Sequence, residues 1–214
     1  RDRVQKMKDG VDGWGNTNWY DKIYGTGTRT HHNISATGGS DRVRFFASIG
    51  YLDEKGNIDN YGYNRLNLRS NIDAKLTKSL TFTLGVSGRI EKRDSPRYSA
   101  NPDDWHNVPQ QVIRALPYVP ATYEYEGKVY NVSTPTASSP VAPLASINES
   151  GYSKSNYSYI QSNFSLKYDA PWLKGLSFKF QGAYDLTYNF SKILTNPYEV
   201  MIMNLPTIES TSLT

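Results

Sequence analysis

The sequence predicts an all-β fold, an antiparallel meander of about six long strands that forms part of the wall of a transmembrane β-barrel. Three observations predict it: apolar and polar residues alternate with period two, the strands run to about 10 to 15 residues, and the connections alternate between short and long. Period-two alternation places successive side chains on opposite faces of a strand. Soluble strands average about five or six residues, whereas membrane-crossing strands need about 9–11.

The composition differs from that of a compact soluble core. Hydrophobic residues make up 37% of the 214 residues, and tyrosine is abundant at 17. Globular domains usually contain about 45–50% apolar residues, so a chain with fewer of them and many aromatics suits sheets that are polar on one face. The formal charge of +4 comes from scattered Lys and Arg. Without a basic run, the sequence argues against a nucleic-acid partner.

Several signals are missing from the sequence. There is no cysteine, which excludes thiol catalysis and zinc–thiolate sites and is compatible with either an oxidising or a reducing compartment. The sequence contains no run of about 20 apolar residues, so no transmembrane helix is predicted. Residues 1–10 are polar and lack the apolar core of a signal peptide. We therefore expect the N-terminal part of an outer-membrane precursor to be absent here or processed away.

The chain divides into three parts. Residues 1–30 are predicted as a loop segment leading into the barrel, with at most one helical turn at 1–8, and residues 31–192 as a partial barrel. Residues 193–214 are predicted as a loop or an unassigned tail. Within the barrel part, alternation predicts strands at residues 31–37, 42–53, 63–76, 80–92, 156–168 and 176–192.

Five of these strands separate charged from apolar residues by face. In the third strand one face carries Leu66 and Leu68, and the other carries Arg65, Asn67 and Arg69. Over residues 42–51, 65–76, 80–90, 159–168 and 176–190 one face holds no charged residue, and the opposite face holds all ten. A soluble sandwich would turn the apolar face towards a core, and a membrane barrel would turn it towards lipid. Alternation alone therefore leaves both architectures open.

The connections favour the barrel. The short turns are 38–41, 77–79 and 170–175, and the long connections are 54–62, 93–155 and the residues after 192. Outer-membrane barrels place short turns in the periplasm and long loops outside the cell. Four aromatic residues lie near strand ends on the apolar face: Tyr51, Tyr168, Tyr188 and Phe190. This placement is typical of interfacial girdles, and simple core packing is the alternative.

Motifs in the strand region point to a known family. Residues 33–41 contain a Gly-Gly pair at 38–39 and lead into Phe-Phe at 45–46 and Gly-Tyr-Leu-Asp at 50–53. Spaced arginines then precede Asn-Ile-Asp at 71–73, and Ala-Leu-Pro-Tyr-Val-Pro follows at 115–120. Together these motifs resemble the SusC/RagA family of TonB-linked (TonB-dependent) outer-membrane proteins over about residues 19–192.

The resemblance implies a function and a set of partners. Such proteins are much longer and carry a plug domain, a TonB box and a 22-stranded barrel, so this chain would be a fragment of the β-barrel domain. The implied function is binding and import of oligosaccharides or peptides through the outer membrane of a Gram-negative cell, without enzymatic activity. The implied partners are a SusD-like surface lipoprotein, the TonB–ExbB–ExbD energising complex, a glycan or peptide substrate and outer-membrane lipid. The alternative is a soluble or surface-exposed β-rich glycan-binding module.

The residue patterns indicate no catalytic or metal site, and no cofactor is expected. His31 and His32 are adjacent in a strand and so point to opposite faces, while His106 stands alone. Asp103 and Asp104 lack the pattern of an EF-hand loop. Neither a Gly-x-Ser-x-Gly motif nor a phosphate-binding loop is present.

Two groups of residues are candidates for contact with a ligand. The proline-rich loop 93–155 is expected to be extracellular. Its aromatic rings can pack against the C–H faces of sugars. Alternatively, they serve only to anchor the loop. The candidates are Trp105, Tyr118, Tyr123 and Tyr125. The second group shares one face of the strand 63–76 and is expected to face the lumen, either in a cross-strand ion network or in contact with substrate: Arg65, Arg69, Asp73 and Lys75.

Overall fold

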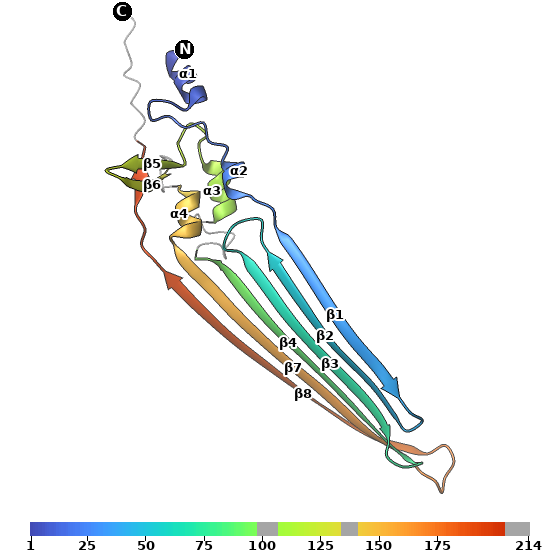
Figure 1. Ribbon diagram of the computed structural model, residues 1–214. Helices are drawn as coiled ribbons and strands as arrows, with labels where there is room; N and C mark the ends of the chain where they lie inside the picture. Colours follow the sequence, from blue (N-terminus) through green and yellow to red (C-terminus); the bar gives the residue numbers. More distant parts are fainter. Residues whose placement is uncertain (98–106, 134–140, 204–214) are drawn as a thin grey trace, which may run out of the picture.

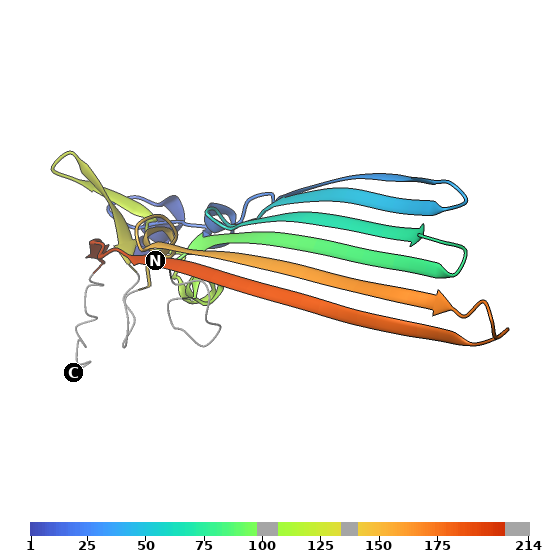
Figure 2. The ribbon, with the colours of Figure 1, turned by 90° about the horizontal axis from the view of Figure 1, so that it is seen from below.

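A computed structural model describes residues 1–97, 107–133 and 141–203. Six long strands form one antiparallel sheet in the order β1-β2-β3-β4-β7-β8, which appears as a single elongated layer in Figures 1 and 2. Their bounds are β1 Thr28–Gly39, β2 Val43–Lys55, β3 Gly62–Lys75, β4 Leu80–Pro96, β7 Gly151–Asp169 and β8 Ser177–Thr195. The predicted all-β antiparallel meander is confirmed.

The strands are longer than predicted at the end of the sheet where the long connections lie. β4 continues to Pro96, β7 begins at Gly151, and β8 continues to Thr195. The β4–β7 ladder runs without interruption from Leu80 opposite Tyr168 to Pro96 opposite Tyr152. Both strands are paired on both sides, so neighbouring strands supply hydrogen bonds even where the local sequence is polar and resembles a loop.

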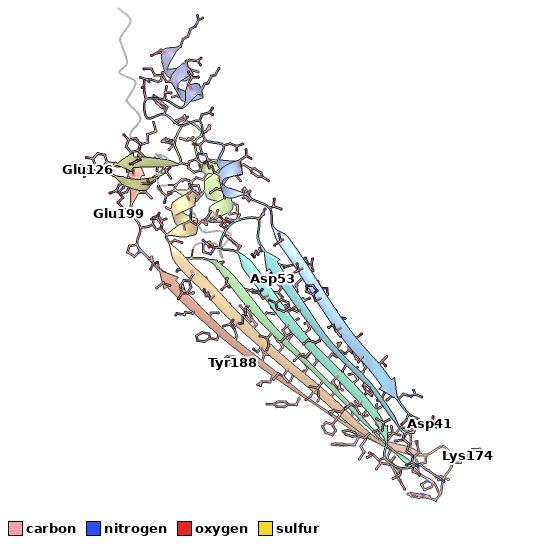
Figure 3. The ribbon with its side chains drawn as sticks, in the orientation of Figure 1. Asp41, Asp53, Glu126, Lys174, Tyr188 and Glu199 are labelled. Atoms are coloured by element: carbon pink, nitrogen blue, oxygen red, sulfur yellow. The ribbon has the colours of Figure 1, made fainter. Side chains whose placement is uncertain are left out.

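Short turns lie at one end of the sheet and long connections at the other, as predicted. β1–β2, β3–β4 and β7–β8 are joined by residues 40–42, 76–79 and 170–176. Figure 3 shows Asp41 and Lys174 at this end, which we call the turn end, and Glu126 and Glu199 at the opposite end. We call the opposite end the loop end.

The strand register confirms that the apolar faces of all six strands lie on the same side of the sheet. One row across the sheet consists of Ile34, Ile49, Leu68, Gly88, Ile160 and Leu186. The adjacent row, whose side chains point to the other side, consists of Asn33, Gly50, Asn67, Arg89, Tyr159 and Thr187. Because directly paired residues share a face, the sheet has one apolar side and one polar side.

The apolar side is exposed and has a defined height. No second layer of described residues covers its large side chains. Phe180, for example, is 65% exposed. Towards the loop end the same face becomes charged at Asp53 and Lys92. The eight steps from Val43 to Tyr51 cover about 27 Å along the strand, which a tilt of about 40° reduces to about 21 Å. This is close to the apolar band of about 25 Å in outer-membrane barrels.

The two buried apolar clusters lie in a cap at the loop end of the sheet. Three short helices build this cap: α2 (Trp19–Ile23), α3 (Val108–Arg114) and α4 (Pro143–Asn148). One buried cluster joins Ile23, Ile58, Val108 and Ile147, and another joins Trp19, Ala115 and Val141. Among the described residues, no helix is long and apolar enough to cross a membrane.

The structure corrects the prediction of a loop over residues 1–30. Helix α1 (Asp2–Asp9), helix α2 and the start of β1 lie there. Asn18 caps α2, because its side-chain oxygen accepts hydrogen bonds from the backbone N–H groups of Tyr20 and Asp21 at 3.2 and 3.4 Å. The helix persists because its apolar side chains are buried in the cap.

The described residues of the connection 93–155 and of the segment after 192 also form more regular structure than predicted. A second, three-stranded sheet contains β5 (Thr122–Tyr125), β6 (Lys128–Ser133) and β9 (Val200–Ile202), in that order. β5 and β6 form a hairpin whose turn, Glu126-Gly127, has positive φ at both residues, as tight hairpins require. β9 pairs parallel to β6, so residues 200–202 belong to this sheet.

A close backbone contact joins the N-terminal segment to the cap. The Gly15 N–H donates to the Tyr118 carbonyl at 2.8 Å, and the Thr17 N–H donates to Pro117 at 2.7 Å. A Cβ atom on Gly15 would lie 2.6 Å from the Val119 carbonyl oxygen. Only glycine therefore permits this approach.

Gly15→Ala should separate residues 10–18 from the segment 115–120, at a cost of about 1–3 kcal/mol from the overpacked backbone. Limited proteolysis of the intact protein should show faster cleavage in both segments. Gly25→Ala is the matched control, because the atom nearest to its added Cβ would be 3.9 Å away. Equal cleavage rates for the two variants would contradict the role of this contact.

Candidate functional site

The four residues predicted to face the lumen lie together on the polar side of β3. Arg65 and Arg69 lie towards the loop end, and Asp73 and Lys75 lie towards the turn end. None of the four forms an ion pair with another described residue. The expected cross-strand ion network among them is therefore not observed in the described part of the chain.

The ion pairs of this region centre on Glu91, which the sequence analysis missed. Its two carboxylate oxygens lie 3.0 Å from Arg89 Nε and 3.1 Å from Arg93 Nη2. Glu91 is only 4% exposed, so its charge depends on these two guanidinium groups. The sequence signal was the continued alternation of Arg89, Glu91 and Arg93, which the predicted strand end at residue 92 cut short.

Tyrosine rings pack against the guanidinium groups of Arg89 and Arg93. The Arg89 guanidinium carbon lies 4.3 Å from the centre of the Tyr159 ring, and that of Arg93 lies 5.2 Å from the Tyr157 ring. Such contacts fix the plane of the guanidinium and leave its edges for hydrogen bonding. We define the arginine cluster as Arg65, Arg69, Arg89 and Arg93 with Glu91, Tyr157 and Tyr159.

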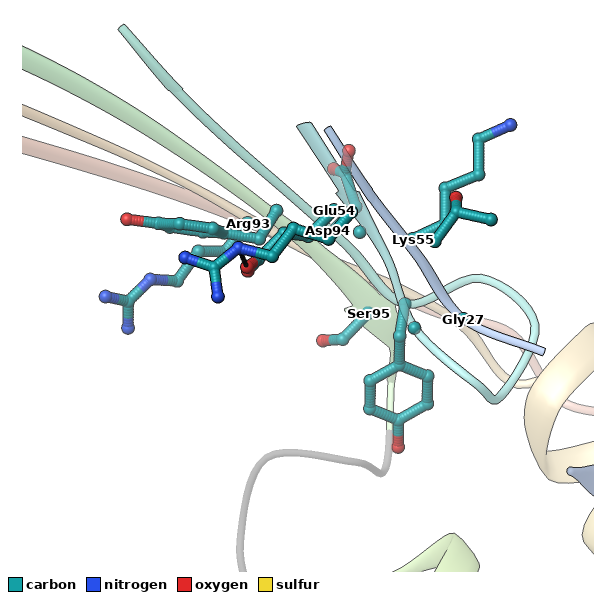
Figure 4. A pocket seen from close by; sticks show the side chains of 12 residues that line it. Gly27, Glu54, Lys55, Arg93, Asp94 and Ser95 are labelled. Carbon is teal, nitrogen blue, oxygen red and sulfur yellow. Dashed lines mark ion pairs between the residues drawn. The ribbon is translucent and has the colours of Figure 1, made fainter. Parts of the chain in front are cut away.

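A cavity of about 580 Å³ lies at the loop end of the sheet, where residues of β1, β2, β3 and β4 line it (Figure 4). Residues of both charges line it, and Arg29 pairs with Glu54 there through Nε and Oε1 at 2.9 Å. Because its charges largely compensate each other, this cavity has no strong preference for a ligand of one charge.

Two further hollows, of about 470 and 490 Å³, lie near the middle of the sheet and share Arg69, Ser87 and Gln161. Small residues at Gly85 and Ala183 contribute to the first hollow. The second hollow also contains Asn67, Arg89 and Tyr159, and no carboxylate lines it. It therefore offers mainly hydrogen-bond donors and positive charge to a ligand.

The predicted aromatic contacts do not form a single group. Tyr123 and Tyr125 share one face of β5 and are 46% and 51% exposed. Tyr118 is half-buried, and its ring packs edge-on against Trp14 at 6.1 Å. Trp105 lies outside the described residues.

The β5–β6 hairpin also carries a charged site beside its tyrosines. Lys128 Nζ lies 4.4 Å from the centre of the Tyr130 ring and 3.5 Å from the Glu199 carboxylate. Its electrostatic interaction with Tyr130, and a smaller one with Glu199, raise the pKa of Lys128 above its ordinary value. No group of three or more potential metal ligands occurs in residues 1–97, 107–133 and 141–203.

The fold and its two faces define a class of protein. A sheet of long antiparallel strands, with an apolar band on one side, a charged side opposite and short turns at one end, has the architecture of a transmembrane β-barrel wall. No protein-family model matches the chain. Its similarity to individual proteins places it more narrowly.

Curated relatives are TonB-dependent receptors. TonB-dependent receptor P3 of Formosa agariphila is 33% identical over 84 residues, which are 39% of this chain and 8% of the relative. TonB-dependent receptor SusC of Bacteroides thetaiotaomicron is 32% identical over 60 residues, which are 28% of this chain and 6% of the relative. The resemblance to the SusC/RagA family is thereby confirmed over part of the chain.

Solved structures agree on the fold. The RagAB peptide importer in its closed-closed state matches with a TM-score of 0.65 and 20% identity, over 91% of this chain and 22% of that one. The structure of the RagAB peptide transporter matches with a TM-score of 0.63 and 19% identity, over 92% and 24%. The matched segments thus cover less than a tenth of the curated relatives, and the structural match covers about a quarter of the solved chains.

Proposed function

We propose that this chain is a segment of an outer-membrane TonB-dependent transporter that binds and imports oligosaccharides or peptides. The observation that carries the proposal is the two-faced sheet, whose apolar residues lie on one side in register across six strands. Lipid is the environment that such an exposed apolar band fits. The similarity to TonB-dependent receptors supports the same assignment.

The proposal assigns a place to each part of the chain. Residues 31–192 contribute strands to a barrel of 22 strands, with the polar side of the sheet, including Asp73 and Lys75, towards the lumen. The connection 93–155 is extracellular, beside a SusD-like surface lipoprotein, and TonB–ExbB–ExbD supplies energy from the inner membrane. A soluble glycan-binding module fits less well, because it would have to cover side chains such as Tyr184, which is 65% exposed.

The test is uptake by cells that carry the intact protein. Fluorescently labelled peptide and oligosaccharide mixtures should enter these cells, and uptake of at least one mixture should fall at least tenfold when the gene is deleted. Inactivation of TonB in otherwise unchanged cells should have the same effect. Unchanged uptake of both mixtures in both strains would refute the transporter assignment.

Within this function we propose aromatic contacts to substrate at Trp105, Tyr118, Tyr123 and Tyr125. Tyr123 and Tyr125 present adjacent rings on one exposed face of the hairpin. Such rings bury large apolar area at low conformational cost. Tyr118 differs from these two, because its ring also supports Trp14.

Tyr123→Ala and Tyr125→Ala should each weaken substrate binding by about threefold to tenfold, as expected for loss of about 0.5–1.5 kcal/mol of aromatic contact. Binding is measured on intact cells with the labelled mixtures and corrected for surface expression. Val129→Ala is the control, because its exposed side chain lies on the same hairpin and is not aromatic. Normal expression with unchanged affinity in both tyrosine variants would contradict this assignment.

A further inference from the structure

The arginine cluster concentrates positive charge on the polar side of the sheet. Its four guanidinium groups lie on the adjacent strands β3 and β4, and Glu91 is its one carboxylate. Glu54 lies nearby but pairs with Arg29. Within the described part of the chain, the positive charge of the cluster is therefore only partly compensated.

Arg65 shows the imbalance most clearly. It lies directly opposite Glu91 in the β3–β4 register. Both oxygens of Glu91 are nevertheless occupied by Arg89 and Arg93. Arg65 Nε is buried and has no hydrogen-bond partner among the described residues. A buried cationic donor without an acceptor is costly, so an acceptor supplied from elsewhere would be stabilising here.

A hollow of about 490 Å³ lies one step further along β3 and β4 and is suited to a negatively charged group. Arg69, Arg89, Asn67, Ser87, Tyr159 and Gln161 contribute to its lining. Arg89 is already oriented, because Tyr159 packs against its guanidinium and Glu91 accepts from its Nε. Its terminal nitrogens therefore remain for a second partner. Guanidinium groups bind planar or tetrahedral oxyanions through paired hydrogen bonds, which a lysine ammonium cannot match.

We propose that the hollow lined by Arg69 and Arg89 is a binding site for an oxyanion group, a carboxylate, sulfate or phosphate, carried by the imported molecule. This inference rests on the proposed function, since it takes the polar side of the sheet as the lumen wall. It goes further by assigning a negative charge to the cargo. The site lies about halfway along the strands, where cargo passes on its way between the loop end and the turn end.

The test uses the intact protein, purified in detergent and titrated calorimetrically with sodium sulfate, sodium phosphate and sodium acetate. Chloride keeps the ionic strength constant, so that general screening does not contribute. We expect saturable binding of at least one of the three probes to the wild-type protein. Arg65→Gln combined with Arg69→Gln should weaken it at least tenfold, and Arg69→Lys should weaken it about threefold, because the charge remains but the planar fork is lost.

Lys167→Gln combined with Lys179→Gln is the matched control. These two lysines also face the polar side and pair across β7 and β8, but they lie at the turn end, away from the hollow. The control should change the affinity less than twofold. Every variant is first checked for the folded state by heat-modifiable electrophoretic mobility.

Three results would overturn the inference. The first is absence of saturable binding in the wild-type protein, and the second is an equal loss in the arginine and lysine variants. The third is a fall in thermal stability of the arginine variant with unchanged anion affinity, which would show that the arginines pair with another part of the protein. TonB-dependent uptake without anion binding would refute the inference and leave the transporter assignment intact. If the uptake test refuted the transporter assignment, calorimetry would still decide whether the hollow binds an anion.

Discussion

Leu68→Arg should reduce the folded, membrane-inserted fraction of the intact protein more than tenfold. Leu68 lies between Ile49 and Gly88 in the middle of the apolar band. An arginine on the lipid face near the middle of the membrane costs about 2–4 kcal/mol, and about 1.4 kcal/mol corresponds to a factor of ten. The folded fraction is measured in outer-membrane preparations from its heat-modifiable electrophoretic mobility.

Asn67→Arg is the control for this prediction. It introduces the same side chain one residue away, but on the polar side, where Asn67 lies between Gly50 and Arg89. We expect assembly close to the wild-type yield, because the added charge can remain in contact with water. Equal yields for the two variants would show that the faces of the sheet are assigned wrongly.

Trp19→Ala should unfold the cap locally while the sheet stays assembled. Trp19 is 4% exposed, packs with Ala115 and Val141, and donates a hydrogen bond from Nε1 to the Leu116 carbonyl at 3.0 Å. Removal of a buried tryptophan typically costs about 3–5 kcal/mol. Because two short helices of a small core depend on it, we expect the cap to become sensitive to protease on whole cells.

Tyr20→Ala tests whether this effect requires burial. Tyr20 is 63% exposed, and its ring stacks on Tyr24 at 4.6 Å. Its loss should cost less than about 1.5 kcal/mol and leave the cap resistant. Protease resistance of the Trp19→Ala variant, or equal sensitivity of both variants, would refute the assignment of Trp19 to the core.

Only part of the candidate site could be predicted from the sequence. Alternation alone placed Arg65 and Arg69 on one face, because the Cβ atoms of a strand alternate between its two sides. It did not reveal that Arg89 and Arg93 would occupy both oxygens of Glu91, or that Nε of Arg65, opposite Glu91, would have no hydrogen-bond partner among the described residues. The placement of Arg65 opposite Glu91 depends on which residues of β3 and β4 are paired, and a shift in register by one residue would have exchanged the faces.

The sequence by itself determined the class of the fold and the identity of the two faces, since both follow from local periodicity and from the lengths of strands and turns. The cap was decided by tertiary structure. Trp19 and Leu116 are 97 residues apart in sequence, and neither flanking segment has a periodic pattern long enough to predict a stable element. Their helices are stable because they bury apolar side chains against each other. Strand length beyond residue 92 was decided in the same way, because a polar segment becomes a strand when a paired neighbour on each side satisfies its backbone hydrogen bonds.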